Sequence, residues 1–140
     1  MPRIIFDIFN SSIYPVGDGE AQDRINCKIG IPSFITGPEY LGELHKNLPG
    51  YIDSVCNCNS RVAMAIYNGG TDVLDTDPLG GLNIPAATIR ERDLYVVGEL
   101  RKRDIPTVMV LSGGYTRQSY QLVADSAIPL MEREAERNGI

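Results

Sequence analysis

Two short apolar segments, each followed one residue later by Gly-Gly, most constrain how this chain folds. Residues 62–67 form a continuous apolar run, and residues 107–111 form a second, β-branched one. The first predicts a central strand of a parallel sheet that is buried on both faces. Between the two segments, Pro85 is well placed in the first turn of a helix that ends near Asp104, before Pro106. A strand, a helix and a second strand in this order predict two parallel strands joined by a helical crossover.

The N-terminal half of the sequence predicts a further strand and a helix. Residues 4–9 are rich in β-formers and predict a strand, whereas residues 11–34 lack clear periodicity and predict a long loop. Thr36 is suited to cap a helix, with Glu39 at the capping-box position. We expect Pro49 to kink or split this helix, because proline removes a backbone hydrogen bond.

The C-terminal residues predict one long helix. It starts near residue 116, places Tyr120 and Met131 on its inward face, and has a kink at Pro129. The alternation of strands and helices along the chain predicts an α/β fold, in which a parallel β-sheet is packed against flanking helices. We expect residues 1–140 to form a single domain, because this length is typical of one domain.

Composition narrows the classes of function. Apolar residues make up 43% of the chain and charged residues 22%, which is ordinary for a globular protein. The formal net charge is −5 and the basic residues are scattered, so we expect no nucleic-acid binding. No apolar run is long enough to span a bilayer, so we expect no membrane association. The odd number of cysteines, three, and the lack of an apparent secretory leader predict a cytoplasmic protein.

The candidate site lies where the two apolar strands end. In open parallel sheets, ligands bind at the carboxyl ends of the strands, where the loops converge. Asp72 and Tyr115 follow the two glycine pairs, and their loops bring both side chains to this edge. A carboxylate can bind a metal ion, and a phenol can donate a hydrogen bond to a developing oxyanion. By spacing alone, two ordinary turns, with Asp72 capping a helix and Tyr115 packing beside it, are the favoured alternative.

Four motifs, taken in order, resemble the C-terminal region of the histone deacetylase family. They are Tyr-Asn-Gly-Gly-Thr-Asp at 67–72, Asp-Pro-Leu-Gly-Gly-Leu-Asn-Ile at 77–84, Arg-Asp at 92–93 and Ser-Gly-Gly-Tyr at 112–115. The sequence is most similar to the class IV type and its bacterial relatives. The resemblance is strong from residue 67 to residue 115 and weaker from residue 11 to residue 60, where Ile-Tyr-Pro at 13–15 matches best.

The resemblance implies a partial arginase/deacetylase-like fold and a zinc hydrolase of acetyl-lysine or acyl-lysine. It matches Asp72 to a zinc-ligating aspartate, and Tyr115 to the tyrosine that polarises the substrate carbonyl. Gly113 and Gly114 match the glycines that shape the floor of the substrate pocket, and Leu79 matches a wall of the acyl-lysine tunnel. For Asp77, which follows in the same loop, a structural role in the turn is favoured over a chemical one.

The chain departs from the family pattern in the residues that complete the zinc site. The family places a His-His pair and an Asp-x-His motif before the strand matched by residues 4–9, and this sequence has neither. His45 is the single histidine, and its helical context predicts a solvent-exposed position. One carboxylate falls short of the three protein ligands of a catalytic zinc site. We therefore expect the isolated chain to bind zinc poorly and not to hydrolyse acetyl-lysine.

Two hypotheses of function follow. The first is a portion of a zinc deacetylase, whose substrate is an acetylated or acylated lysine or amine. The second is a noncatalytic binding or regulatory module that retains half of the deacetylase fold. A sheet with so few strands leaves apolar surface uncovered, so we expect either self-association or a missing N-terminal segment that covers it.

Overall fold

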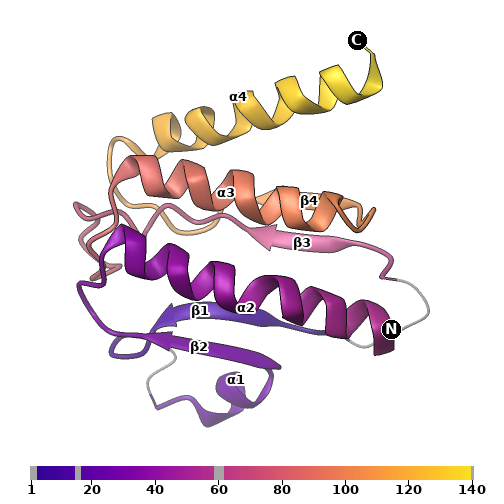
Figure 1. Ribbon diagram of the computed structural model, residues 1–140. Coiled ribbons are helices and arrows are strands. Elements are labelled where there is room, and N and C mark those ends of the chain that lie inside the picture. The colour runs from indigo at the N-terminus through magenta and orange to yellow at the C-terminus, as the bar shows by residue number, and fades with distance from the viewer. Residues whose placement is uncertain (1–2, 15–16, 59–61, 140) are drawn as a thin grey trace.

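The structure, a computed structural model, describes residues 3–14, 17–58 and 62–139. Helices and strands alternate along the whole of this part (Figure 1). In chain order the elements are β1 (Phe6–Asn10), α1 (Gly19–Asp23), β2 (Cys27–Ile31), α2 (Gly37–Cys58), β3 (Ala65–Asn68), α3 (Ala86–Arg101), β4 (Thr107–Val110) and α4 (Ser119–Asn138). Pro15, part of the weaker motif match, lies outside the described residues.

The strands form two parallel pairs. β1 pairs with β2 from Phe6 opposite Cys27 onwards, and β3 pairs with β4 from Ala65 opposite Thr107 onwards. The predicted α/β class with parallel strands is confirmed, but the strands form two separate two-stranded sheets in the described residues. The prediction of an unbroken loop at residues 11–34 was wrong, because this stretch contains both α1 and β2. A glycine within β2 weakens its strand signal.

Two of the longer helices pack against the strands, and α4 packs against one of these helices. α2 contacts β1 and β2, α3 contacts β3 and β4, and α3 lies between α2 and α4 (Figure 1). This arrangement is typical of α/β folds, in which each helix buries one apolar stripe on a sheet. The buried core comes from β2, α2, α3, α4 and the loops between the elements, and it consists of Ile31, Ile35, Tyr40, Leu41, Leu44, Leu48, Ile52, Leu74, Leu82, Ile84, Ile89, Val96, Leu100, Ile105 and Leu122.

The start of α2 follows the sequence prediction, and of the two outcomes expected at Pro49 the split does not occur. The Glu39 carboxylate accepts hydrogen bonds from the Thr36 backbone N–H, at 2.9 Å, and from its hydroxyl, at 2.6 Å. This is half of a capping box. The helix then runs through Pro49 as a single element, so it is not split there. None of the helices in the described ranges is long and apolar enough to cross a bilayer.

Two burial predictions were wrong. β3 was expected to be buried on both faces, yet its side chains alternate and Ile66 is 67% exposed. The reason is that α3 covers only one face of the β3–β4 pair. In α4, Tyr120 and Met131 are exposed, and Leu122 and Ser126 are the buried residues. Apolar character alone thus placed these two side chains of α4 wrongly.

Candidate active site

The loops that follow β3 and β4 run side by side. The ladder between the strands continues beyond them, because the Gly69 N–H donates to the Val110 carbonyl at 3.0 Å. Two residues further, the Thr71 N–H donates to the Gly113 carbonyl at 2.7 Å. The backbone just before Asp72 is therefore held against the Gly-Gly pair of the second loop, as parallel strand ends predict.

Asp72 lies half-buried against glycines of both loops. A Cβ atom on Gly113 would lie 2.1 Å from Asp72 Oδ2, and one on Gly70 would lie 3.0 Å from Oδ1. The Asp72 carboxylate occupies the space that a side chain at position 113 would need, so only glycine fits there. Burial raises the pKa of Asp72, and the nearby Asp77 charge adds to this rise. In the described part of the chain, no other residue donates a hydrogen bond to this carboxylate.

The partial burial of Asp72 predicts that its charge destabilises the metal-free fold. Because the pKa is raised in the folded state, stability falls as pH rises from the ordinary aspartate value, about 4, through the raised value. Asp72→Asn should raise Tm by a few degrees at pH 7, and this gain should shrink near pH 4. Thermal unfolding checks it, with the exposed Asp75→Asn as the control. An unchanged or lower Tm at pH 7 for Asp72→Asn would contradict the prediction.

Tyr115 and Leu79 lie at the exposed rim of these loops. The Tyr115 side chain is 60% exposed and that of Leu79 is 56% exposed. Gly114, directly before Tyr115, has a φ of 153°, and a Cβ atom there would lie 2.2 Å from Thr71 Oγ1. The Gly-Gly pair thus lets the second loop approach the first closely and then turn outward at Tyr115. In the described residues, the Tyr115 hydroxyl has no hydrogen-bond partner.

Asp77 connects the two loops. Asp77 is buried, with a relative exposure of only 7%. Oδ1 accepts from the backbone N–H groups of Leu79, at 2.9 Å, and Gly80, at 3.2 Å. Oδ2 accepts from the Tyr115 backbone N–H at 2.8 Å. The predicted role in the turn is therefore observed, together with a bond to the second loop that the sequence did not predict.

The same loop is also attached to the β1–β2 sheet. Asn10, the last residue of β1, donates from Nδ2 to the Gly80 carbonyl at 3.2 Å. The Phe34 N–H donates to the Gly81 carbonyl at 2.9 Å, and Thr36 and Asn83 form an isolated parallel bridge. Residues 71–84 therefore cross-link the two sheets and hold Asp72 and Asp77 between fixed points.

A buried ion pair between Arg92 and Asp93 holds the loop that follows β3. Arg92 Nε donates to Asp93 Oδ1 at 2.9 Å, and both side chains are almost completely buried. The Tyr67 hydroxyl donates to the same carboxylate oxygen. Arg92 Nη1 donates to the Gly70 carbonyl at 2.9 Å, two residues before Asp72. The Arg-Asp motif, which had no role in the sequence analysis, therefore positions the backbone of the candidate site.

A hollow of about 190 Å³ lies behind the glycines. Gly113 and Gly114, predicted to shape the substrate pocket, are in its wall, but Asp72, Leu79 and Tyr115 are not. Its lining consists of Gly69, Thr71, Leu111, Ser112, Gly113, Gly114, Ser119, Tyr120 and Val123. The candidate residues thus lie around one pair of loops, with Asp72 and Tyr115 outside this hollow.

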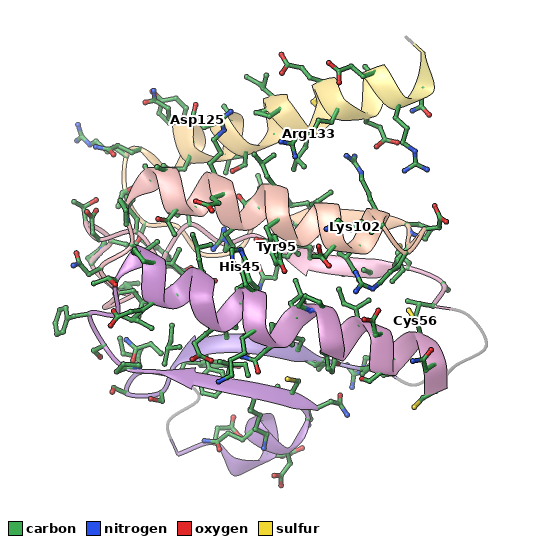
Figure 2. All side chains as sticks on the ribbon, viewed as in Figure 1. His45, Cys56, Tyr95, Lys102, Asp125 and Arg133 are labelled. Carbon is green, nitrogen blue, oxygen red and sulfur yellow. The ribbon has the colours of Figure 1, made fainter. Side chains whose placement is uncertain are left out.

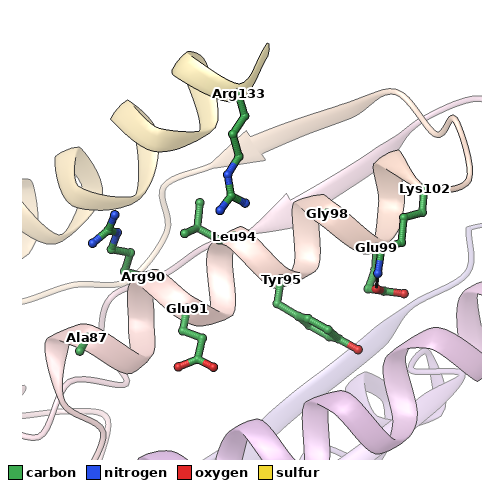
Figure 3. A pocket seen from close by; sticks show the side chains of 9 residues that line it. All are labelled: Ala87, Arg90, Glu91, Leu94, Tyr95, Gly98, Glu99, Lys102 and Arg133. Carbon is green, nitrogen blue, oxygen red and sulfur yellow. Dashed lines mark hydrogen bonds and ion pairs between the residues drawn. The ribbon is translucent and has the colours of Figure 1, made fainter. Parts of the chain in front are cut away.

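A larger and more open groove, of about 510 Å³, lies along α3 and contains none of the predicted site residues. Figure 3 shows Tyr95 on α3 and Lys102 directly after its end, with Arg133 extending toward the groove from α4. His45, predicted to be exposed, is exposed, and its ring lies 4.2 Å from that of Tyr95 (Figure 2). This histidine therefore belongs to the helix layer and not to the loops that carry Asp72.

The described residues do not contain the full set of ligands that a zinc ion needs. Within the described ranges, no group of three His, Cys, Asp or Glu side chains is placed to hold a metal ion. Asp72 fits as one ligand, because its carboxylate is free of hydrogen bonds from other described residues. One carboxylate does not make a catalytic zinc site.

Comparison with known proteins decides the family. The sequence profile of the histone deacetylase domain matches residues 3–131. The chain is 41% identical, over 122 residues, to Histone deacetylase 2 of Arabidopsis thaliana. The chain belongs to the histone deacetylase family. The alignment covers 87% of this chain but 30% of the relative, so this deacetylase-family chain spans about a third of that protein.

Asn10 was missed by sequence reasoning as a residue that holds the loop of the candidate site. Asn10 is buried, whereas a polar residue at the end of a strand usually indicates the start of an exposed loop. The hydrogen bond from the Tyr115 N–H to the Asp77 carboxylate was also missed, because the two residues are 38 positions apart in the sequence. Neither long-range hydrogen bond has a local sequence pattern that would have predicted it.

Proposed function

We propose that this chain is the C-terminal part of a class IV-type, zinc-dependent deacetylase. The complete enzyme would add water across the amide of acetyl-lysine or acyl-lysine, breaking the C–N bond to release a carboxylate and the free amine. The observation that carries the proposal is the packing of Asp72 against Gly113, which places a free carboxylate at the junction of two loops that also carry Tyr115. The family membership supplies the reaction class.

The proposed roles follow the positions of the side chains. Asp72 would be one zinc ligand, because it is half-buried and lacks a hydrogen bond from any other described residue. The exposed Tyr115 phenol would donate a hydrogen bond to the substrate carbonyl oxygen as negative charge develops. Gly113 and Gly114 would form the pocket floor, and the exposed Leu79 would contact the acyl-lysine chain.

The remaining zinc ligands and the general base would come from a segment that this chain does not supply. Ile66 and Val108 lie exposed on the face of the β3–β4 pair that α3 does not cover. Parallel sheets are normally buried on both faces, which supports the proposal that the rest of a deacetylase domain covers this one. We propose that the isolated chain is inactive. Its three cysteines are free thiols, in keeping with a reducing cytoplasm.

A chimera tests the proposal. The aligned stretch of Arabidopsis Histone deacetylase 2 is replaced by this chain, and turnover of an acetyl-lysine peptide is measured with and without a zinc chelator. We expect chelator-sensitive turnover. Tyr115→Phe should lower kcat about 100-fold or more, because it removes a donor to the oxyanion.

The control is Tyr95→Phe, because Tyr95 lies in α3 along the groove that contains none of the predicted site residues. It should leave kcat unchanged. A folded but inactive chimera would favour the noncatalytic module, and equal activity of Tyr115→Phe and the parent would reject the role of Tyr115.

A further inference from the structure

We propose that Asp77 is a positioning residue that fixes Tyr115 relative to Asp72. Its carboxylate joins the backbone of the loop after β3 to that of the loop after β4. The link between the loops stands on the geometry alone. Its consequence for catalysis rests on the proposed deacetylase function.

The two carboxylate oxygens of Asp77 have separate tasks. Oδ1 accepts from Leu79 and Gly80 and closes a turn within its own loop. Oδ2 is thereby aimed outward and accepts from Tyr115. The backbone of Asp77 is itself fixed, because its N–H donates to the Leu74 carbonyl at 2.9 Å. Since the residue is buried, water cannot easily replace any of these bonds.

Tyr115 depends on this bond because little else holds it. Its side chain is largely exposed and its hydroxyl has no partner among the described residues. The residue before it is Gly114, and glycine has the most permissive backbone of any residue type. The hydrogen bond to Asp77 therefore fixes where the Tyr115 side chain leaves the loop. The rate of a catalysed reaction is sensitive to shifts of about 1 Å in the position of a catalytic group.

The first experiment uses the unmodified chain. In a doubly ¹³C,¹⁵N-labelled sample, a long-range NMR correlation detects scalar coupling through a hydrogen bond, here from the Tyr115 amide nitrogen to the Asp77 side-chain carboxyl carbon. We expect this coupling to be observed. Its absence, while couplings across the β3–β4 ladder are visible in the same spectrum, would overturn the proposal without the need for any variant.

The second experiment uses Asp77→Asn and the matched control Asp75→Asn, an exposed carboxylate in the same loop. An asparagine can accept on one side only, so at least one backbone N–H loses its partner. We expect the Tyr115 amide to exchange with solvent about tenfold faster in Asp77→Asn, while amides of α3 are unchanged. Asp75→Asn should resemble the parent. Unchanged Tyr115 exchange in Asp77→Asn would overturn the proposal.

The third measurement separates positioning from mere stability. In the chimera, Asp77→Asn should lower kcat about tenfold at an unchanged KM, and Asp75→Asn should change neither. A KM increase at unchanged kcat would overturn the positioning role. If the parent chimera has no turnover, the proposed function fails, whereas the coupling and the exchange results still decide whether Asp77 holds Tyr115.

Discussion

Gly80→Ala should destabilise the fold by about 3 kcal/mol and lower Tm by roughly 10 °C. A Cβ atom at this position would lie 1.6 Å from the Asp72 carbonyl oxygen and 2.8 Å from the Asp72 carbonyl carbon. Both are backbone atoms, so no side-chain rotation relieves the overlap. The loop has to move, and it carries both Asp72 and the Gly80 N–H that Asp77 binds. Denaturant unfolding with a fluorescent or circular dichroism signal measures the effect.

Gly42→Ala is the matched control for this substitution. Gly42 lies within α2, and a Cβ atom there would meet nothing within 4 Å. The change should stabilise the chain by about 0.5–1 kcal/mol, because alanine is the better helix former. Equal effects of the two substitutions would show that the close approach of Gly80 to Asp72 does not exist in solution.

Asp93→Ala should cost about 3–5 kcal/mol, because it leaves the buried Arg92 guanidinium without its carboxylate. Asp93 is 1% exposed, so water cannot take its place. The Tyr67 hydroxyl also loses its acceptor. Since Arg92 in turn holds the Gly70 carbonyl, amide exchange in residues 69–72 should accelerate more than in β1. Equilibrium unfolding and amide exchange give the two readouts.

Glu91→Ala provides the comparison on the same helix. Glu91 is exposed and forms no ion pair or hydrogen bond in the described residues, so its loss should change stability by less than about 0.5 kcal/mol. A similarly small effect of Asp93→Ala would mean that the Arg92–Asp93 pair contributes little to stability. It would then also have no part in supporting the candidate site.

The sequence predicted the parts of this fold that have a local signal. The apolar runs that stop at Gly-Gly correctly gave β3, β4 and the crossover helix α3 between them. Parallel strand ends then predicted that the loops with Asp72 and Tyr115 would lie together, and the Thr71 to Gly113 hydrogen bond joins them. Asp72 does not cap α3, because that position is taken by Pro85.

The features that escaped prediction depend on residues distant in sequence. The second strand was missed because Cys27–Ile31 is short and interrupted by glycine, and its stability comes from pairing with β1. The exposed face of β3 reflects that α3 covers only the other face of the strand pair, which the apolar run cannot report. The bonds of Asp77 and Asn10 likewise connect loops that only the tertiary fold brings together.

The most direct test of the central claim, that Asp72 belongs to a deacetylase zinc site shared with Tyr115, is the zinc content of the purified chimera. We expect about one zinc ion per chain in the parent and in Asp75→Asn, and a loss of most of it in Asp72→Asn, because one of three protein ligands is weakened. Full zinc occupancy in a folded Asp72→Asn chimera would contradict the account.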